Sequence, residues 1–391
     1  MKEPQYHALP DELSVLVSQH WQHFVESGHR IPDALLDDLP RVWAGSDYVA
    51  QQFQRDPGLG QWLEDSDPSG ALAEDSLRQT VQEQLAACHS EDELKRTLRR
   101  LRHRHMVRII WRDSCGLADF QETVGDLSHL ADACIDGALD KLYGWMEPEF
   151  GLPYYHPSPS PSSQQGQPMP MVVLGMGKLG ACELNLSSDI DLMFAYAHEG
   201  ETRGGRRSLA HRDFFTRLGQ KLIKALDENT VDGFVFRVDM RLRPYGSSGA
   251  LALNFRAMES YYEEQGREWE RYAMIKARAI GSDNGDGDEL LRRLRPFVYR
   301  RYVDFGVIGK AKTTYYPNKL RKQQEIVKDG LIADAKKNLQ EKANLTNNQA
   351  YANLTIDILE TTKGTSSQYG TIINEVTIEA VVSADIIEYI D

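Results

Sequence analysis

The sequence contains no hydrophobic run that approaches the ~18–20 consecutive apolar residues of a membrane-spanning helix. It has only four cysteines, and their spacing does not match that of metal ligands: Cys88, Cys115, Cys134 and Cys182. No signal peptide is apparent at the N-terminus. We therefore expect a cytoplasmic protein with reduced thiols, without a membrane-embedded part or a disulfide framework.

Positive charge is also scarce. Lysine and arginine number 45 against 58 aspartate and glutamate residues, which gives a net charge of −13 at pH 7. A protein that binds nucleic acid along its surface needs a basic face to attract the phosphates, so this deficit argues against nucleic-acid binding. Local basic patches could still bind a nucleotide. The apolar content of 41% and the length of 391 residues fit a globular protein of two or three domains.

The chain changes character three times, which predicts four segments. Residues 1–155 show helical periodicity and predict a helical N-terminal domain. Residues 156–170 are rich in proline and serine and predict a linker, because prolines remove hydrogen-bond donors. Residues 171–308 hold the motifs described below, and 309–391 form a tail richer in lysine, asparagine, threonine and isoleucine.

One long helix of the N-terminal segment carries a run of arginines. Ser90 and Glu93 form a capping-box pattern that predicts its start. The arginines between residues 96 and 112 either form a binding face for a nucleotide or an acidic partner, or pair with neighbouring acids. We favour the structural interpretation, since such runs usually form solvated or paired helix faces.

A glycine- and lysine-containing loop lies between two expected strands. The apolar run Met171–Leu174 predicts the first strand and Ile190–Tyr196 predicts the second. The loop between them carries four candidate nucleotide-binding residues, Gly175, Gly177, Lys178 and Gly180. It lacks the Gly-Lys-Ser/Thr sequence of a P-loop, so the loop alone is a weak signal.

Two aspartates flank Ile190 at the start of the second strand. Residues two apart in a strand point to the same face, so Asp189 and Asp191 should project together. Two carboxylates on one face repel each other unless a cation lies between them. Mg²⁺ is the usual cation for carboxylates and substrate phosphates. An Asp-x-Asp pair by itself is nevertheless common and is more often a solvated strand end.

A third acid follows downstream. Residues 234–243 alternate apolar and charged side chains, which predicts a strand with Asp239, Arg241 and Arg243 on one face. Such a strand, paired beside the second one, would bring Asp239 to the same metal. The arginines could bind phosphate through bidentate hydrogen bonds. Three acids and several arginines around a glycine-rich turn indicate metal-dependent phosphoryl or nucleotidyl transfer.

Further elements are expected after the acids. Residues 213–228 predict a helix packed on the sheet, and residues 259–279 predict another that carries Lys276 as a phosphate-binding candidate. We expect Trp269 in the core rather than stacked on a base. The acidic segment 281–288 does not follow the EF-hand order and predicts a turn.

Four strings together resemble one enzyme family. These are LGMGKLG at 174–180, ELNLSSDIDL at 183–192, RVDMRLRPYG at 237–246 and YYEEQGREWERYAMIKAR at 261–278. They resemble glutamine synthetase adenylyltransferase/adenylyl-removing enzymes, which belong to the DNA polymerase β type of nucleotidyltransferases. The residues on either side of the acids are similar to those in the N-terminal, deadenylylating half of that family.

The resemblance implies an α+β fold, in which helices flank the mixed sheet of a nucleotidyltransferase domain at 171–308. It implies phosphorolytic removal of AMP from an adenylylated tyrosine of glutamine synthetase, with Mg²⁺ as cofactor. It further implies phosphate, ADP and ATP as ligands and a PII-type nitrogen-signalling protein as partner. The implied metal ligands are Asp189, Asp191 and Asp239. The implied nucleotide-binding residues are Gly175, Gly177, Lys178, Gly180, Ser188, Arg241, Arg243 and Lys276.

Two alternatives remain open at this point. The same metal site could transfer AMP from ATP to the tyrosine, because both directions need the same ions. A non-catalytic nucleotide- or partner-binding module is the other alternative. It arises because residues 309–391 lack a Gly-Gly-Ile-Arg-Glu-Ile-Glu-Phe-like string found in the family. The tail is therefore either a foreign segment or a divergent one.

Overall fold

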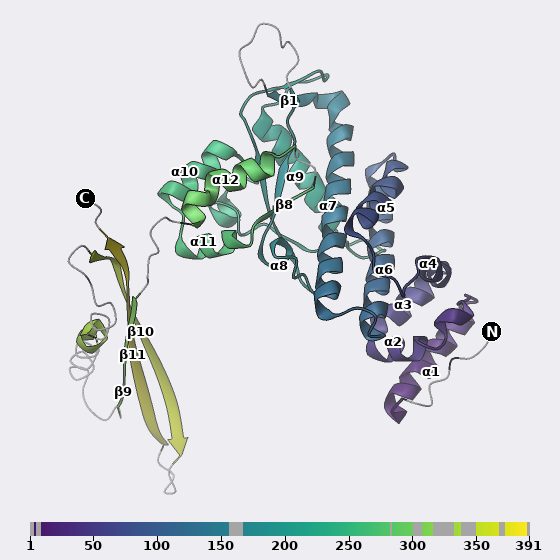
Figure 1. Ribbon diagram of the computed structural model, residues 1–391, viewed down its shortest axis with the longest axis horizontal. Coiled ribbons are helices and arrows are strands. Elements are labelled where there is room, and N and C mark those ends of the chain that lie inside the picture. The colour runs from purple at the N-terminus through teal and green to yellow at the C-terminus, as the bar shows by residue number, and fades with distance from the viewer. Residues whose placement is uncertain are drawn as a thin grey trace. The chain divides into compact units, whose positions relative to one another are not determined.

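The computed structural model describes residues 4, 9–155, 167–281 and 284–299, and in the C-terminal part 307–315, 332–337, 349–366 and 372–388. The chain divides into two compact units, Met1–Val298 and Tyr299–Asp391. The first unit is α+β, as the sequence predicts, with helices on both faces of a mixed sheet (Figure 1). Among the described helices, none combines the length and the apolar character needed to span a membrane.

The N-terminal part of the first unit is helical, which confirms the prediction from periodicity. Its short helices are α1 (Asp11–Glu26), η1 (Asp33–Leu35), α2 (Leu39–Gly45), α3 (Asp47–Arg55), α4 (Leu59–Asp65) and α5 (Glu74–Ala86). The helical periodicity over 33–42 predicts a single helix, but the chain forms η1 and then restarts at α2. Pro40 lies in the first turn of α2, where a missing N–H costs little. Trp43 is fully buried against Trp21, Phe24 and Phe53 and holds these helices together.

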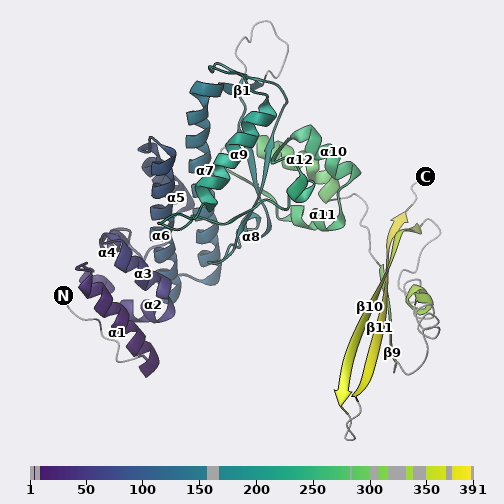
Figure 2. The same ribbon diagram turned by 180° about the vertical axis from the view of Figure 1, so that it is seen from behind.

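Two long helices, α6 (Glu91–Ser114) and α7 (Phe120–Phe150), run side by side and connect the small helices to the sheet (Figures 1 and 2). Ser90 caps α6, since its hydroxyl accepts a hydrogen bond from the Glu93 amide at 3.3 Å. The Glu93 carboxylate in turn accepts from the His89 amide at 2.7 Å, one residue before the expected position.

Several arginines of α6 make structural contacts, as we expected, but four of them are buried and do not belong to a solvated helix face. The buried four are Arg99, Arg102, Arg108 and Arg112. Arg108 donates hydrogen bonds to the carbonyls of Asp67 and Gly70, and Arg112 also donates to Gly70. These bonds fix the loop between α4 and α5 against α6, because burying a guanidinium group is costly unless it finds hydrogen-bond acceptors.

His105, also on α6, makes the stability of the fold sensitive to acid. Burial, assisted by the charges of Arg108 and Arg104, lowers its pKa from 6.5 to about 4. The unfolded chain therefore binds this proton before the folded chain does. The contribution of His105 is complete above about pH 6.5 and is lost as the pH falls towards about 4. We expect His105→Phe to remove up to about 3 kcal/mol of the acid-induced loss in unfolding free energy.

Urea unfolding at about pH 7.5 and about pH 4.5 measures this difference. His23→Gln is the control, because His23 is exposed on α1. An acid-induced loss of equal size in His105→Phe and in the unaltered protein would contradict the prediction.

The main sheet separates two hydrophobic cores. Its strands are β3 (Val172–Gly175), β4 (Ile190–Tyr196), β6 (Val238–Asp239), β7 (Ala252–Asn254) and β8 (Arg278–Ile280). The order is β6-β4-β3-β8, and β7 continues along the same edge of β4 as β6. β3 is antiparallel to both its neighbours, whereas β6 and β7 run parallel to β4. The expected strands at Met171–Leu174 and Ile190–Tyr196 are thus present.

Alternate residues of β4 enter opposite cores. Leu192 and Phe194 pack with α7 and α9 (His211–Asp227), and this core continues to α5 and α6. Met193 and Ala195 pack on the other face, against α10 (Phe255–Glu264), α11 (Glu268–Ile275) and α12 (Asp286–Val298). Figures 1 and 2 show α10, α11 and α12 gathered on the side of the sheet away from α7. From Leu192 to Tyr196, β4 carries no charged side chain for this reason.

Two predicted elements are wrong in extent. The strand expected over 234–243 is only Val238–Asp239, because the amides of Val235 and Phe236 instead bond to the Leu226 carbonyl at the end of α9. The helix expected over 259–279 breaks into α10, α11 and strand β8. Gly266 lies at the break, where a Cβ would approach Phe297 and the Tyr262 carbonyl to 2.5 Å.

Smaller pieces complete the description. A second sheet has the order β2-β1-β5, formed by β1 (Leu152–Tyr155), β2 (Gln167–Pro168) and β5 (Thr202–Arg203). The expected linker lies outside the described residues from 156 to 166, and its described end places a proline in an edge strand. In the second unit, β9 (Val307–Tyr315) and β10 (Gln349–Ser366) flank β11 (Ile372–Glu388) in an antiparallel sheet.

Candidate active site

The parallel pairing of β4 with β6 brings two of the predicted acids together. Ile190 is in register with Val238, and Asp191 is in register with Asp239. Residues paired in register on adjacent strands project to the same face of the sheet. The short β6 is therefore sufficient to place Asp239 beside Asp191, although the two are far apart in the sequence.

Asp189 belongs to the same electrostatic cluster. The pKa of Asp191 is raised, first because burial removes water from its carboxylate and then because Asp239 and Asp189 repel its negative charge. Asp191 is half-buried, and its carboxylate accepts no hydrogen bond from the described residues. The three acids thus interact at one end of β4, and we refer to them as the acid cluster.

Two arginines neutralise the outer members of the acid cluster. The Nε of Arg237 lies 2.5 Å from Asp189 Oδ1, and the Nε of Arg241 lies 2.8 Å from Asp239 Oδ2. The hydrogen bond from Arg241 is the main reason why the pKa of Asp239 is lowered. Arg237 shares the charged face of residues 234–243 with Asp239 and Arg241, but it is not among the predicted site residues. Only the contact to Asp189 distinguishes it.

The carboxylates of the acid cluster are suitable ligands for a hard divalent ion, although their positions do not converge on one point. Within the described parts of the chain, no three histidine, cysteine, aspartate or glutamate side chains are arranged to hold a metal ion. In place of a metal ion, the guanidinium groups of Arg237 and Arg241 supply the positive charge next to Asp189 and Asp239. Carboxylate oxygens are the ligands that Mg²⁺ prefers. Asp189 and Asp239 would have to leave their arginines to bind it together with Asp191.

The glycine- and lysine-containing loop closes over the acid cluster. Residues Gly177–Gly180 form a single helical turn, α8, which is connected to β4 by a hydrogen bond from the Met176 amide to the Asp191 carbonyl at 2.9 Å. Gly177 has a positive φ of 55°, and a Cβ there would lie 2.7 Å from Asp191 Oδ2. Glycine at this position therefore leaves room for the Asp191 carboxylate.

Lys178 and Ser188 meet beside this turn. The Lys178 Nζ lies 3.2 Å from the Ser188 hydroxyl oxygen, and that hydroxyl donates to Asn185 Oδ1 at 2.7 Å. The charge of Lys178 also acts on Asp191, whose pKa it lowers against the stronger opposing effects. The structure thus brings both predicted residues to the acid cluster.

Gly180 has a steric role, which a substitution can test, and its predicted contact with nucleotide remains a prediction. A Cβ at Gly180 would overlap the carbonyl oxygen of Lys276 and lie 2.5 Å from that of Gly175. We expect Gly180→Ala to lower the unfolding free energy by about 2–3 kcal/mol, since two backbone segments must separate. Urea unfolding measures the loss. Gly125→Ala in α7 is the matched control: a Cβ there meets nothing within 4 Å, so equal destabilisation of the two variants would contradict this account.

Arg243 and Lys276 contact other partners. The Arg243 guanidinium donates to the carbonyls of Met240 and Ser247 at 2.7 and 3.1 Å, and so holds the turn after β6 in place. Its charge still contributes to lowering the pKa of Asp239. The Lys276 ammonium lies 2.8 Å from Glu183 Oε2. Their proposed contacts with phosphate remain predictions.

The expectation that Trp269 lies in the core is wrong. Its side chain is 49% exposed on α11 and lines a cavity of about 370 Å³ together with Arg241 and Tyr245. Helical periodicity could not show this, because the break at Gly266 turns α11 relative to the expected helix. This cavity adjoins the acid cluster through Arg241.

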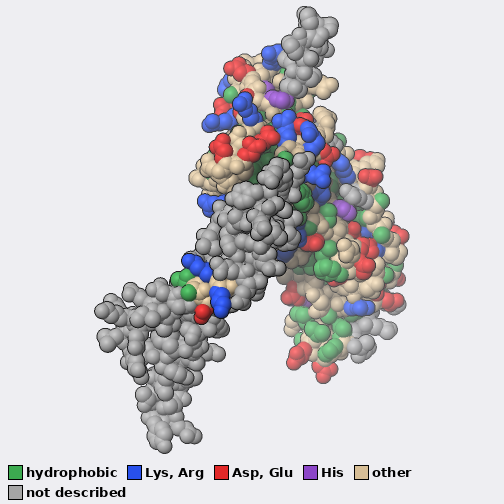
Figure 3. All heavy atoms as spheres, turned by 60° about the vertical axis from the view of Figure 1, so that its left-hand side comes forward, with side chains coloured by type: hydrophobic (Ala, Val, Ile, Leu, Met, Phe, Trp, Pro, Cys, Tyr) green, Lys and Arg blue, Asp and Glu red, His purple; other side chains and the backbone are tan. Residues whose placement is uncertain are grey.

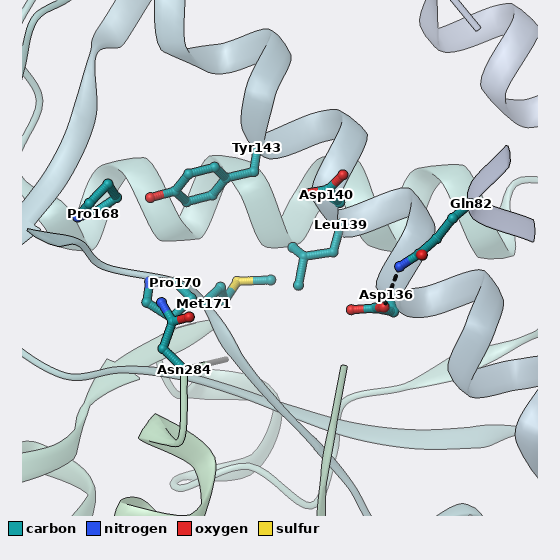
Figure 4. Close-up of a pocket in the computed structure, with 9 residues that line it drawn as sticks. All are labelled: Gln82, Asp136, Leu139, Asp140, Tyr143, Pro168, Pro170, Met171 and Asn284. Atoms are coloured by element: carbon teal, nitrogen blue, oxygen red, sulfur yellow. Dashed lines mark hydrogen bonds between the residues drawn. The ribbon is translucent and has the colours of Figure 1, made fainter. Parts of the chain in front are cut away.

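Another cavity, of about 260 Å³, lies away from these residues (Figure 4). Asp136, Asp140 and Tyr143 of α7 line one side of it, and Pro168 and Met171 line another. None of the predicted site residues lies there. The described surface on the face drawn in Figure 3 intermixes acidic and basic side chains. Because it combines three carboxylates with two arginines and Lys178, the acid cluster is the best candidate for the active site on chemical grounds.

Comparison with known proteins identifies the family of this chain. A family model described as glutamate-ammonia ligase adenylyltransferase matches residues 36–293. A bifunctional glutamine synthetase adenylyltransferase/adenylyl-removing enzyme of Pseudomonas aeruginosa is 54% identical over 306 residues, which cover 78% of this chain and 30% of that protein. The proteins of the same name from Hahella chejuensis and Pseudomonas putida are 50% and 48% identical, over 76% and 86% of this chain.

The chain spans about a third of the length of these relatives, with coverage of 30%, 31% and 34%. The match nevertheless includes the helices from α2 on and the whole acid cluster, since residues 36–293 contain α2 to β8. Each of the four strings that suggested the resemblance also lies within the matched range. The chain therefore belongs to the glutamate-ammonia ligase adenylyltransferase family.

Proposed function

We propose that this chain removes AMP from an adenylylated tyrosine of glutamine synthetase, by phosphorolysis with Mg²⁺, and thereby regulates nitrogen assimilation. The parallel register of Asp191 and Asp239 is the observation that supports a metal-dependent reaction best. The printed names of the relatives include both adenylyl transfer and adenylyl removal. Removal is favoured because the strings around the acids are similar to the N-terminal half of the family.

Inorganic phosphate would attack the α-phosphorus of the tyrosyl-AMP. A new P–O bond forms as the bond to the tyrosine oxygen breaks, so the products are ADP and a tyrosine that takes up a proton. Asp189, Asp191 and Asp239 would hold Mg²⁺, which supplies a Lewis acid for the phosphoryl oxygens. Arg237 and Arg241 would then be free to donate to phosphate oxygens, and Lys178 would add a third positive charge.

Glutamine synthetase and a PII-type signalling protein are the proposed macromolecular partners, and phosphate, ADP and ATP are the proposed small ligands. Transfer of AMP from ATP to the same tyrosine is the second candidate, since the relatives' names include it. The acid cluster would serve both reactions, because the phosphate charge to be stabilised is similar.

Two reaction mixtures distinguish these functions. The first contains the full chain, adenylylated glutamine synthetase, phosphate and Mg²⁺, and the second contains ATP, Mg²⁺ and the unmodified partner. We expect ADP release in the first mixture. Pyrophosphate release in the second mixture alone would support transfer instead. Binding of nucleotide or partner without turnover in either mixture would contradict both reactions and support a non-catalytic module.

A further inference from the structure

The cavity beside the acid cluster has an aromatic wall. Tyr245 is 50% exposed and Trp269 is 49% exposed, although large aromatic side chains are usually buried. Tyr261 packs against Tyr245 with ring centroids 4.5 Å apart. We refer to the cavity bounded by Tyr245, Tyr261, Gln265, Trp269 and Arg241 as the aromatic pocket.

The backbone of Tyr245 is held in an unfavourable conformation. Its φ is +61°, in the left-handed region that residues with a Cβ rarely adopt. The guanidinium of Arg243 fixes the following residues, because it donates to the carbonyls of Ser247 and Gly249. Strain of this kind persists only where the surroundings impose it, and it is concentrated at functional sites.

Glu270 also lines the aromatic pocket, and its carboxylate is already hydrogen-bonded. The Glu270 carboxylate is 3% exposed, and it accepts from the Tyr261 hydroxyl at 2.7 Å and from the Arg267 amide at 2.8 Å. The Gln265 amide group lies at the wall, where its Nε2 is 3.4 Å from the Tyr245 hydroxyl. An amide both donates and accepts, which suits the ring nitrogens and the amino group of a purine.

Arg241 connects the aromatic pocket with the acid cluster. Its side chain lines the pocket, while its Nε and Nη2 donate to Asp239. We propose that the aromatic pocket binds the adenine ring of an adenosine phosphate whose phosphates lie at the acid cluster. The inference rests on the proposed function for the phosphates, but the stacking wall can be tested separately. Every nucleobase offers a flat face on which aromatic side chains can stack, and the adjacent Arg241 can bind the phosphates of the same nucleotide.

The adenosine phosphate could come from free nucleotide or from the tyrosyl-AMP of the partner. We would measure binding of ADP and Mg²⁺ to the full chain by calorimetry, and the KM for adenylylated glutamine synthetase in the phosphorolysis assay. Tripolyphosphate with Mg²⁺ is the probe without a base. The affinities for adenylylated and for unmodified glutamine synthetase are measured as well, to separate binding of the AMP group from binding of the protein.

Trp269→Ala should weaken ADP binding by about 5- to 100-fold, the range expected for loss of one stacking partner. Tripolyphosphate binding should not change. Trp269→Phe should restore most of the affinity, because it keeps a flat ring. Tyr272→Ala is the matched control: Tyr272 is 68% exposed on the same helix but does not line the pocket, so ADP should bind normally. A rise in KM without a loss of ADP affinity would assign the pocket to the tyrosyl-AMP only.

Unchanged ADP affinity and KM in Trp269→Ala would overturn the inference, and the proposed reaction would stand if ADP were still released. Loss of ADP affinity in Trp269→Ala, in a protein that releases no ADP, would support the pocket and contradict the reaction. An equal loss of affinity for unmodified glutamine synthetase would identify a protein-docking surface and overturn the inference.

Discussion

Asp191→Asn is expected to abolish the removal of AMP while leaving the fold intact. Asp191 is the half-buried centre of the acid cluster, and its carboxylate has no hydrogen-bonding partner among the described residues. The substitution removes the charge without changing the size of the side chain. We expect a rate at least about a thousandfold lower, or about 4 kcal/mol of barrier, comparable to the loss of other charged transition-state stabilisers. ADP release from adenylylated glutamine synthetase measures it.

The stability of the same variant provides a second readout. Burial and the neighbouring carboxylates raise the pKa of Asp191, so its negative charge opposes folding. Asp191→Asn should therefore have a melting temperature equal to or above that of the unaltered protein. Asp213→Asn, an exposed position in the first turn of α9, serves as the control and should retain full activity. Normal ADP release by Asp191→Asn would reject the assignment of the active site.

Arg99→Met is expected to cause the largest loss of stability, about 4–5 kcal/mol in unfolding free energy. The Arg99 side chain is fully buried where α6 meets the end of α9. Its guanidinium donates to the carbonyl of Gly233 at 2.7 Å, to that of Ala225 at 3.2 Å, and to that of Glu228. It thus caps the C-terminal turn of α9, whose carbonyls have no other helical partners. Methionine fills a similar volume but removes all three hydrogen bonds, and it leaves the buried Ala225 carbonyl without this donor.

Chemical denaturation of Arg99→Met and Arg100→Met tests this role. Arg100 follows on the same helix but is exposed, so its replacement should change stability by no more than about 0.5 kcal/mol. Similar stabilities of the two variants would mean that the buried hydrogen bonds are not what holds α6 to α9.

The local patterns of the sequence were sufficient for the elements that carry the site. Residues Ile190–Tyr196 form a strand with those same bounds, because their apolar residues from Leu192 on suit a strand that is buried on both faces. The helical period after residue 213 produced α9, and Ser90 marked the start of α6. In the tail, apolar and polar residues alternate over much of 371–390, which predicts a strand, and β11 covers Ile372–Glu388. Each of these patterns is contained in one short segment of the chain, so it can be recognised without knowledge of distant contacts.

Long segments without an internal break were harder to predict. The expected helix over 259–279 satisfied the helical period, yet it is divided at Gly266, where a Cβ would lie 2.5 Å from the Phe297 ring. That contact joins residues about thirty positions apart, so no local pattern encodes it. The exposure of Trp269 follows from the same break. For this reason the aromatic pocket could not be predicted from the sequence.

By itself, the sequence determined the identity of the acids, the strand and loop that carry Asp189 and Asp191, and the family resemblance. These depend on residue type and on local periodicity, which one stretch of chain contains. Only the tertiary structure decided that Asp239 stands in register with Asp191, and that Arg237 and Arg241 hold the outer acids. Strand pairing and side-chain contacts depend on free energies summed over distant segments, and two residues of β6 were enough to fix the site.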